Sequence, residues 1–113
     1  MIERYSRPEM NRIWSDETKF DLWLKVEIAV CEAWTELGRV PAADMEKIRG
    51  AHFDIERIAE ILAITHHDVT AFLQAVAETL GPESRHIHLG LTSSDVMDTA
   101  LSLQMKQSAV LLQ

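Results

Sequence analysis

The sequence predicts an all-α fold. Apolar residues recur at helical spacing in several separate segments of the 113-residue chain, whereas no segment shows the strict alternation typical of a half-buried strand. Hydrophobic residues make up 47% of the chain, which is enough for the core of one domain of this length. Neither an internal repeat nor a low-complexity segment is present in the sequence. We therefore expect helices packed around one core.

The first predicted helix covers residues 16–37. Ser15 or Asp16 can cap its start, and Gly38 can end it because glycine readily adopts a left-handed conformation. Cys31, the single cysteine, lies in an apolar run and is expected to be a buried free thiol. The mostly apolar stripe of this helix consists of Phe20, Trp23, Leu24, Glu27, Val30, Trp34 and Leu37. We expect the two tryptophans of this stripe to pack in the core.

Three shorter helical patterns follow. Pro41 suits the first turn of a helix that covers residues 41–49. The next pattern covers residues 54–65 and ends at the polar stretch 66–68. The third covers residues 69–80 and stops at Gly81-Pro82, because glycine accepts the left-handed cap and proline cannot continue the turn.

The last part of the sequence predicts a connection and then one more helix. Residues 83–91 are predicted to be extended, and helical spacing resumes over residues 95–112. No Gly, Pro or polar stop signal follows residues 110–113, so we expect this helix to continue in a longer chain.

Charge and composition exclude several classes of protein. The formal net charge of −7 disfavours a nucleic-acid-binding surface, which needs clustered Lys and Arg. No stretch approaches the roughly 18 uninterrupted apolar residues of a membrane span, and the opening residues lack the apolar region of a secretory leader. We expect a cytoplasmic protein that binds neither nucleic acid nor a membrane.

Two polar clusters suggest function but have simpler explanations. Arg4-Tyr5-Ser6-Arg7 suits a phosphate and a flat base, although composition alone favours a solvated basic terminus. His66-His67-Asp68 places imidazoles that titrate near neutral pH beside a carboxylate, but Asp68 could merely cap the next helix. His86 and His88 bring enough imidazoles for a zinc site, yet the spacing fits no familiar ligand pattern, so no metal is predicted.

Gly90-Leu91-Thr92-Ser93-Ser94-Asp95 is the most informative cluster. It precedes an apolar helix, whose N-terminus offers unpaired N–H groups and a positive dipole end to a carboxylate or phosphate. One hydroxyl or Asp95 would suffice to cap that helix, so the local sequence leaves ligand binding and ordinary capping open.

Three motifs, in this order, resemble the adenylosuccinate lyase family of the fumarase and aspartase superfamily. They are the opening residues 1–10, the segment His67-Asp68-Val69-Thr70-Ala71-Phe72, and residues 90–100. The resemblance covers essentially the whole chain at the spacing of the family. Within the superfamily, the pair Arg4-Tyr5 points to the purine branch.

The family releases fumarate from adenylosuccinate, giving AMP, and from the succinylated aminoimidazole carboxamide ribotide, by β-elimination without cofactor or metal. The resemblance implies this activity here, with a nucleotide as the small-molecule substrate and a homotetramer as the intact enzyme. It also implies a small helical amino-terminal domain over residues 1–91. Residues 92–113 would then form the truncated start of a long central helical bundle.

The resemblance also implies which side chains contact the substrate. The matching positions are Arg4, Tyr5, His66, His67, Asp68, His88, Thr92 and Ser93. The first two match contacts to the nucleotide, and the next three match positioning residues at a helix junction. His88 matches a histidine near the substrate, and the last two match binding residues at the start of the central helix. His66 stands where Arg or Lys is common, and His86 and Leu89 replace aromatic residues often seen around the equivalent of His88.

The resemblance places the bond-breaking chemistry elsewhere. In the family, the acid is a histidine further along the central region and the base is a serine on a later mobile loop, and neither position exists in this sequence. We therefore assign no catalytic residue and expect this chain alone to be inactive. The alternatives are another fumarate-releasing lyase of the superfamily, and a non-enzymatic helical interaction module whose polar clusters are caps.

Overall fold

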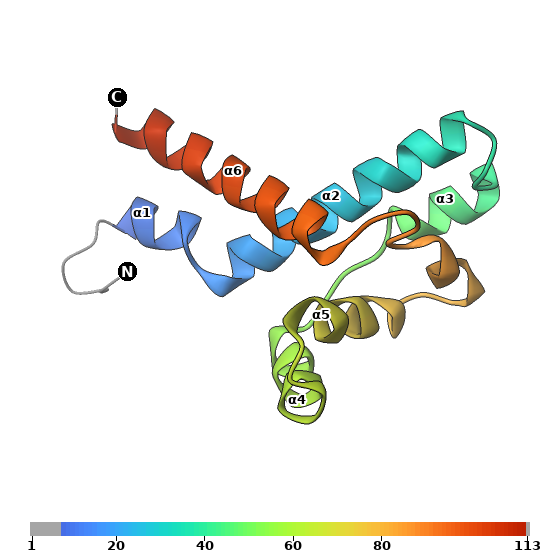
Figure 1. The fold of residues 1–113 in the computed structure, drawn as a ribbon, viewed down its shortest axis with the longest axis horizontal. Helices are drawn as coiled ribbons and strands as arrows, with labels where there is room; N and C mark the ends of the chain where they lie inside the picture. The colour runs from blue at the N-terminus through green and yellow to red at the C-terminus, as the bar shows by residue number, and fades with distance from the viewer. Residues whose placement is uncertain (1–7, 113) are drawn as a thin grey trace.

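A computed structural model describes residues 8–112, and the regular structure within that range is entirely helical, as predicted. The pair Arg4 and Tyr5 lies outside the described residues. The elements are α1 (Pro8–Ile13), α2 (Asp16–Glu36), α3 (Ala42–Ile48), α4 (Ile55–Thr65), α5 (Asp68–Ala77), the 3₁₀ helix η2 (Pro82–His86) and α6 (Ser93–Leu112) (Figure 1). No helix in this range is both long and apolar enough to cross a bilayer.

The two longest helices, α2 and α6, cross near the middle of the molecule (Figure 1). Helix α1 packs against α6, and α4 packs against α5 as an antiparallel pair beneath α2. Two side-chain hydrogen bonds attach α6 to the start of the chain. Nε2 of Gln104 donates to the carbonyl of Ile13 at 3.0 Å, and Nε1 of Trp14 donates to Oγ of Ser108 at 2.8 Å.

Local capping explains where the predicted helices begin. Ser15 precedes α2, and its Oγ accepts a hydrogen bond from the Thr18 N–H at 3.2 Å. Asp54 precedes α4, and its Oδ1 accepts from the Glu56 N–H at 2.9 Å. The capping prediction for Ser15 is therefore confirmed, and the remaining helix bounds differ from those predicted by a few residues at most.

Two features of the fold differ from the sequence-based expectation. Helix α1 was not predicted, because its six residues are too few to show a period. The prediction that residues 83–91 form an extended connection is wrong, since η2 covers Pro82–His86 and turns follow it. Pro82 at the first helical position favours this short 3₁₀ turn, and Oε1 of Glu83 accepts from the Gly81 N–H at 2.8 Å.

The main core is aromatic and joins α2 to α5. Phe72 is 0% exposed, and its ring stacks on Phe20 with centroids 5.8 Å apart. The edges of Trp23 and Phe53 complete the cluster at centroid distances of 5.5 and 6.1 Å from Phe72. The predicted core position of Trp23 is confirmed, whereas Trp34 is only partly buried and packs against a second, smaller cluster.

Replacing Phe72 by alanine is expected to lower the free energy of unfolding by about 3–5 kcal/mol, because it opens a cavity among three aromatic rings. Denaturant unfolding of the protein measures the change. Ile64→Ala is the control, since Ile64 is 80% exposed on α4, and it should change stability by no more than about 0.5 kcal/mol. Equal losses from the two variants would contradict a core centred on Phe72.

Candidate functional site

One face of α2 holds the chain segment of residues 86–89, which leads into α6. Sγ of Cys31 donates to the carbonyl of His86 at 3.5 Å, and Nε1 of Trp34 donates to the carbonyl of Leu89 at 3.1 Å. These α2 residues are three positions apart and therefore lie on one side of the helix. Both contacts go to backbone atoms, so they fix the path of the segment whatever its side chains are.

Glu27 lies one turn before Cys31 on the same face and contacts the same segment. Its side chain is completely buried, and its Oε2 lies 2.5 Å from Nδ1 of His88. The other carboxylate oxygen, Oε1, is also buried and has no hydrogen-bond partner among the described residues. Burial raises the pKa of the Glu27 carboxyl, and the hydrogen bond to His88 offsets part of that rise.

The thiol of Cys31 shares this buried environment. The residue is 1% exposed, as the apolar run around it predicted. Burial, with the nearby carboxylates of Glu27 and Glu32 adding to it, raises the pKa of Cys31 to about 11. The thiol is therefore protonated near neutral pH and acts as a buried donor, not as a nucleophile.

The backbone turns sharply just before α6. His88 has a φ of 69° and Gly90 a φ of 75°, so both adopt the left-handed conformation. Glycine is favoured at position 90, because a Cβ there would make a tight 3.3 Å contact with Cζ2 of Trp34 and would add strain at a φ of 75°. The turn lies between His88 and the first residues of α6, so the imidazole and the helix N-terminus belong to the same short segment.

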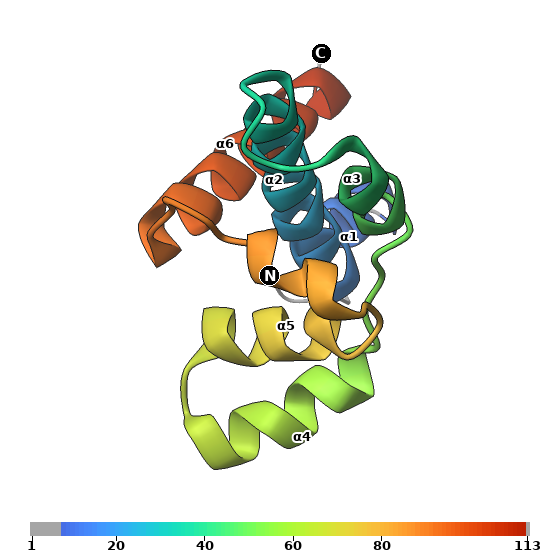
Figure 2. The same cartoon turned by 90° about the vertical axis from the view of Figure 1, so that its right-hand side faces the viewer.

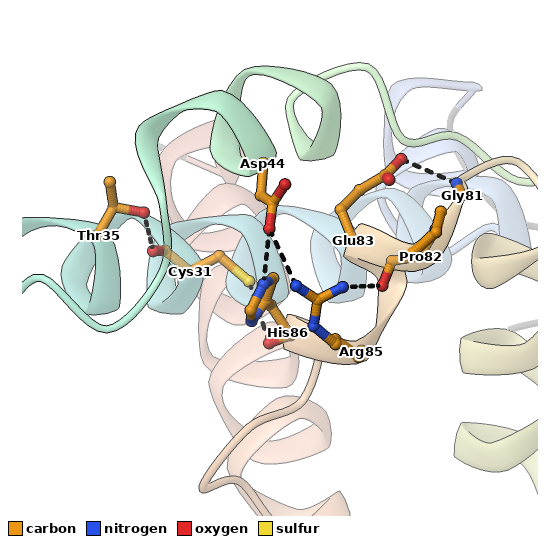
Figure 3. A network of polar contacts seen from close by, with 8 residues as sticks. All are labelled: Cys31, Thr35, Asp44, Gly81, Pro82, Glu83, Arg85 and His86. Carbon is orange, nitrogen blue, oxygen red and sulfur yellow. Dashed lines mark hydrogen bonds and ion pairs between the residues drawn. The ribbon is translucent and has the colours of Figure 1, made fainter.

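The 3₁₀ helix before this turn is anchored to α3 by a polar network (Figure 3). Oδ2 of Asp44 lies 2.9 Å from Nε2 of His86 and 3.4 Å from Nη2 of Arg85. The same guanidinium donates through Nη1 to the carbonyl of Pro82 at 2.9 Å. His86 thus has a structural partner, and its imidazole ties η2 to α3 instead of facing the start of α6.

Thr92 and Asp95 form a reciprocal cap at the start of α6. Oδ2 of Asp95 accepts from the Thr92 N–H at 2.8 Å, and Oγ1 of Thr92 accepts from the Asp95 N–H at 3.4 Å. Capping therefore uses Thr92 and Asp95, while Ser93 and Ser94 take no part in it. Ser93 is half-buried at the first helical position, next to the unpaired N–H groups of the helix N-terminus.

The junction of α4 and α5 contains the other histidine cluster. His66 ends α4 with a φ of 55°, and the N-cap residue of α5 is His67. Nδ1 of His67 accepts from the Thr70 N–H at 3.3 Å, so the cap that the sequence left open at Asp68 is made by His67 instead. This hydrogen bond requires an unprotonated Nδ1 and leaves Nε2 of the exposed ring for another partner.

The structure brings together only part of the predicted substrate-binding set. His88, Thr92 and Ser93 share the segment that enters α6, while residues 66–68 occupy a separate turn. Figure 2 shows the α4–α5 junction and the start of α6 on the same side of the molecule, at the left of the view. No hydrogen bond joins these two places within the part of the chain that the structure describes. No cluster of three or more potential metal-ligating side chains occurs within residues 8–112.

An open groove of about 820 Å³ runs between α2 and α6. Its lining is mostly apolar and includes Val26, Val30, Leu91 and Leu103. An apolar surface lacks the donors that a phosphate or carboxylate needs, so this groove is a poor site for an anionic ligand. The polar segment of residues 88–93 is the better candidate.

Sequence reasoning missed two side chains that shape this site. Glu27 was grouped with a mostly apolar stripe, and Asp44 was not singled out from the helix predicted over residues 41–49. The signal for Glu27 was available, since it is the one carboxylate within an otherwise apolar helical face. Its partner could not be found that way, because His88 lies 61 residues further along the chain.

The described residues form an all-α fold, and its candidate binding site is the polar turn at the N-terminus of the long helix α6. The chain belongs to the lyase family, which matches residues 3–113. It is 59% identical over 109 residues to adenylosuccinate lyase of Bacillus subtilis (strain 168) and 55% identical to that of Staphylococcus saprophyticus. Each alignment covers 96% of this chain, and the chain spans about a quarter (25%) of the length of each relative.

The solved structures show the same fold. A crystal structure of fumarate lyase from Mesorhizobium sp. BNC1 matches 96% of this chain and 27% of its own, with a TM-score of 0.82 and 22% identity. These comparisons confirm the resemblance that the sequence motifs indicated.

Glu83→Gln is expected to destabilise the protein at neutral pH and to have progressively less effect in acid. The N–H of Gly81 and the N–H of Glu83 itself lower the pKa of the Glu83 carboxyl below its ordinary value of 4.5. A carboxyl with a lowered pKa stabilises the fold above its unfolded-state pKa, and that contribution disappears as pH falls through the folded-state pKa. Urea midpoints measured from pH 7 to pH 3 for both proteins test the expectation.

Glu36→Gln provides the matched control, because Glu36 is exposed at the end of α2 and lies away from this turn. A Glu83→Gln effect that is constant across the pH range would contradict the role of the charged carboxylate.

Proposed function

We propose that this chain is the amino-terminal part of an adenylosuccinate lyase. Such an enzyme releases fumarate from adenylosuccinate to give AMP, and from the succinylated aminoimidazole carboxamide ribotide. The observation that carries the proposal is the 59% identity to a curated adenylosuccinate lyase over 96% of the chain. Identity at this level, spread over the whole chain, supports a shared substrate class as well as a shared fold.

The turn into α6 supports binding of an anionic substrate. Helix α6 has 20 residues, and its N-terminus presents backbone N–H groups and a positive dipole end to an anion. The hydroxyl of Ser93 adds a donor there, and Thr92 shapes the first turn through its cap with Asp95. In this proposal Thr92 and Ser93 bind a charged group of the substrate, with His88 beside them.

The remaining predicted residues take supporting roles in the proposal. His67 keeps Nε2 available at the α4–α5 junction, and His66 and Asp68 flank it. These residues would position the substrate, with Arg4 and Tyr5 contacting its nucleotide part. No cofactor is needed for the reaction.

The elimination requires a base, an acid and stabilisation of an anionic intermediate. The base removes a proton next to a succinyl carboxylate, and the acid protonates the departing nitrogen as fumarate leaves. We propose that both groups come from parts of the enzyme outside these 113 residues. The intact enzyme would be a cytoplasmic homotetramer, in which several subunits complete each site.

In the full-length protein, Ser93→Ala is expected to lower kcat/KM for adenylosuccinate by roughly 10- to 100-fold, because a hydrogen bond to a charged group is lost. Fumarate release, followed by absorbance, measures the effect. Ser102→Ala is the control, since Ser102 is exposed on the same helix, and it should leave kcat/KM unchanged. The 113-residue chain alone should release no fumarate.

Absence of fumarate release from either purine substrate, by a folded full-length protein, would contradict the proposed function. Release from a different succinyl compound in the same assay would assign the chain to another branch of its family.

A further inference from the structure

Glu27 is an unusual residue for the interior of a helical domain. Its side chain is 0% exposed, and it sits on α2 between the buried residues Trp23 and Cys31. A buried carboxylate is unfavourable unless partners satisfy both oxygens, and here only Oε2 has one among residues 8–112. An unbranched apolar side chain of similar length would fill the same space without an unsatisfied oxygen. The presence of a carboxylate at position 27 therefore indicates a role beyond packing.

Glu27 contacts the imidazole of His88, which the hydrogen bonds from Cys31 and Trp34 do not reach. The segment around His88 is already held by the hydrogen bonds from Cys31 and Trp34 to its carbonyl groups. Oε2 of Glu27 instead contacts Nδ1 of the ring at 2.5 Å. The His88 side chain is 22% exposed, so part of the ring reaches the surface while Nδ1 faces the core.

The number of protons on the Glu27–His88 pair decides whether Nε2 of His88 is a donor or an acceptor. One shared proton lies between Oε2 and Nδ1, either on the carboxyl or on the ring. When the ring also carries a hydrogen on Nε2, that nitrogen is a donor; when the shared proton on Nδ1 is the only proton of the ring, the carboxylate accepts it and Nε2 is an acceptor. The burial that raises the pKa of Glu27 disfavours an ionised carboxylate, and an anionic ligand at Nε2 also favours the form that carries Nε2–H.

We propose that Glu27 is a positioning residue that shares a proton with His88 and holds the ring so that Nε2–H donates to an anionic group of the substrate. This inference rests on the proposed function for the identity of the substrate, but the paired state of His88 can be tested without it. The anionic group is a phosphate or a carboxylate, both of which accept from an N–H donor. The donor lies four residues before Thr92, so it adds to the anion-binding groups at the start of α6.

The test uses Glu27→Met and Glu27→Gln in the full-length protein. Methionine keeps the length and the burial of the side chain but removes the hydrogen bond, so the melting temperature should stay the same or rise. KM for adenylosuccinate should increase by roughly 10- to 100-fold, the range typical when a residue that orients a functional imidazole is lost. The effect on kcat should be smaller, because Glu27 does not touch the reacting atoms. Glutamine keeps a hydrogen-bonding group without the carboxylate and should give an intermediate KM.

Glu32→Gln is the matched control on the same helix. Its carboxylate pairs with the exposed Arg49, with Oε1 2.6 Å from Nε, and makes no hydrogen bond to His88 among the described residues. This variant should keep the KM of the parent protein.

NMR of the ¹⁵N-histidine-labelled protein tests the pair directly, with His88 assigned by the loss of its signals in His88→Gln. The parent protein should show a proton on Nε2 and a ring signal that moves on addition of AMP or of fumarate. A shift with AMP identifies a phosphate contact, and a shift with fumarate identifies a carboxylate contact. In Glu27→Met, neither ligand should move the signal to the same extent.

Three results would overturn the inference. The first is an unchanged KM in both Glu27 variants, and the second is a loss of activity that merely follows a loss of folded protein in both of them. The third is an unprotonated Nε2 in the parent protein. If the parent protein fails to convert adenylosuccinate, that result contradicts the proposed function and not the Glu27–His88 pair. The NMR measurement of the proton on Nε2 then still tests the pair.

Discussion

The attachment of residues 86–89 to one face of α2 is the constraint on which the candidate site depends. Three successive positions of that face, Glu27, Cys31 and Trp34, each donate to or accept from this short segment. Their spacing of four and three residues is the spacing of one helix turn. Because α2 also carries Phe20 and Trp23 into the aromatic core, the segment is fixed to a helix that is itself anchored in that core.

This attachment explains how an unfavourable backbone conformation is maintained at His88, next to the candidate binding residues of α6. His88 is a non-glycine residue in the left-handed conformation, which is costly in isolation and persists where the surroundings determine it. Here the surroundings are the α2 contacts on one side and, on the other, the network of Asp44 with Arg85 and His86. As a result, the His88 imidazole and the N-terminus of α6 lie within the same short segment of chain.

The sequence was sufficient for the five longer helices, α2 to α6, and insufficient for the contacts between them. Periodicity located α2 and α6, because an apolar stripe must face a core whatever that core contains. It missed η2, since a short 3₁₀ helix is stabilised by a proline and by Glu83 bonding to Gly81, not by a repeating pattern. The clusters at residues 66–68 and 90–95 were visible as composition, and the family motifs gave them roles. The partner of His88 was not visible, because pairing across 61 residues depends on the tertiary fold.

The central claim is that the turn into α6, positioned by α2, contacts the substrate. A crystal structure of the full-length protein with AMP and fumarate bound tests it most directly. We expect Nε2 of His88 and Oγ of Ser93 to lie within about 3.2 Å of a charged oxygen of the ligands, the distance of a hydrogen bond. Ligands bound at a site that includes neither side chain, from any subunit, would contradict it.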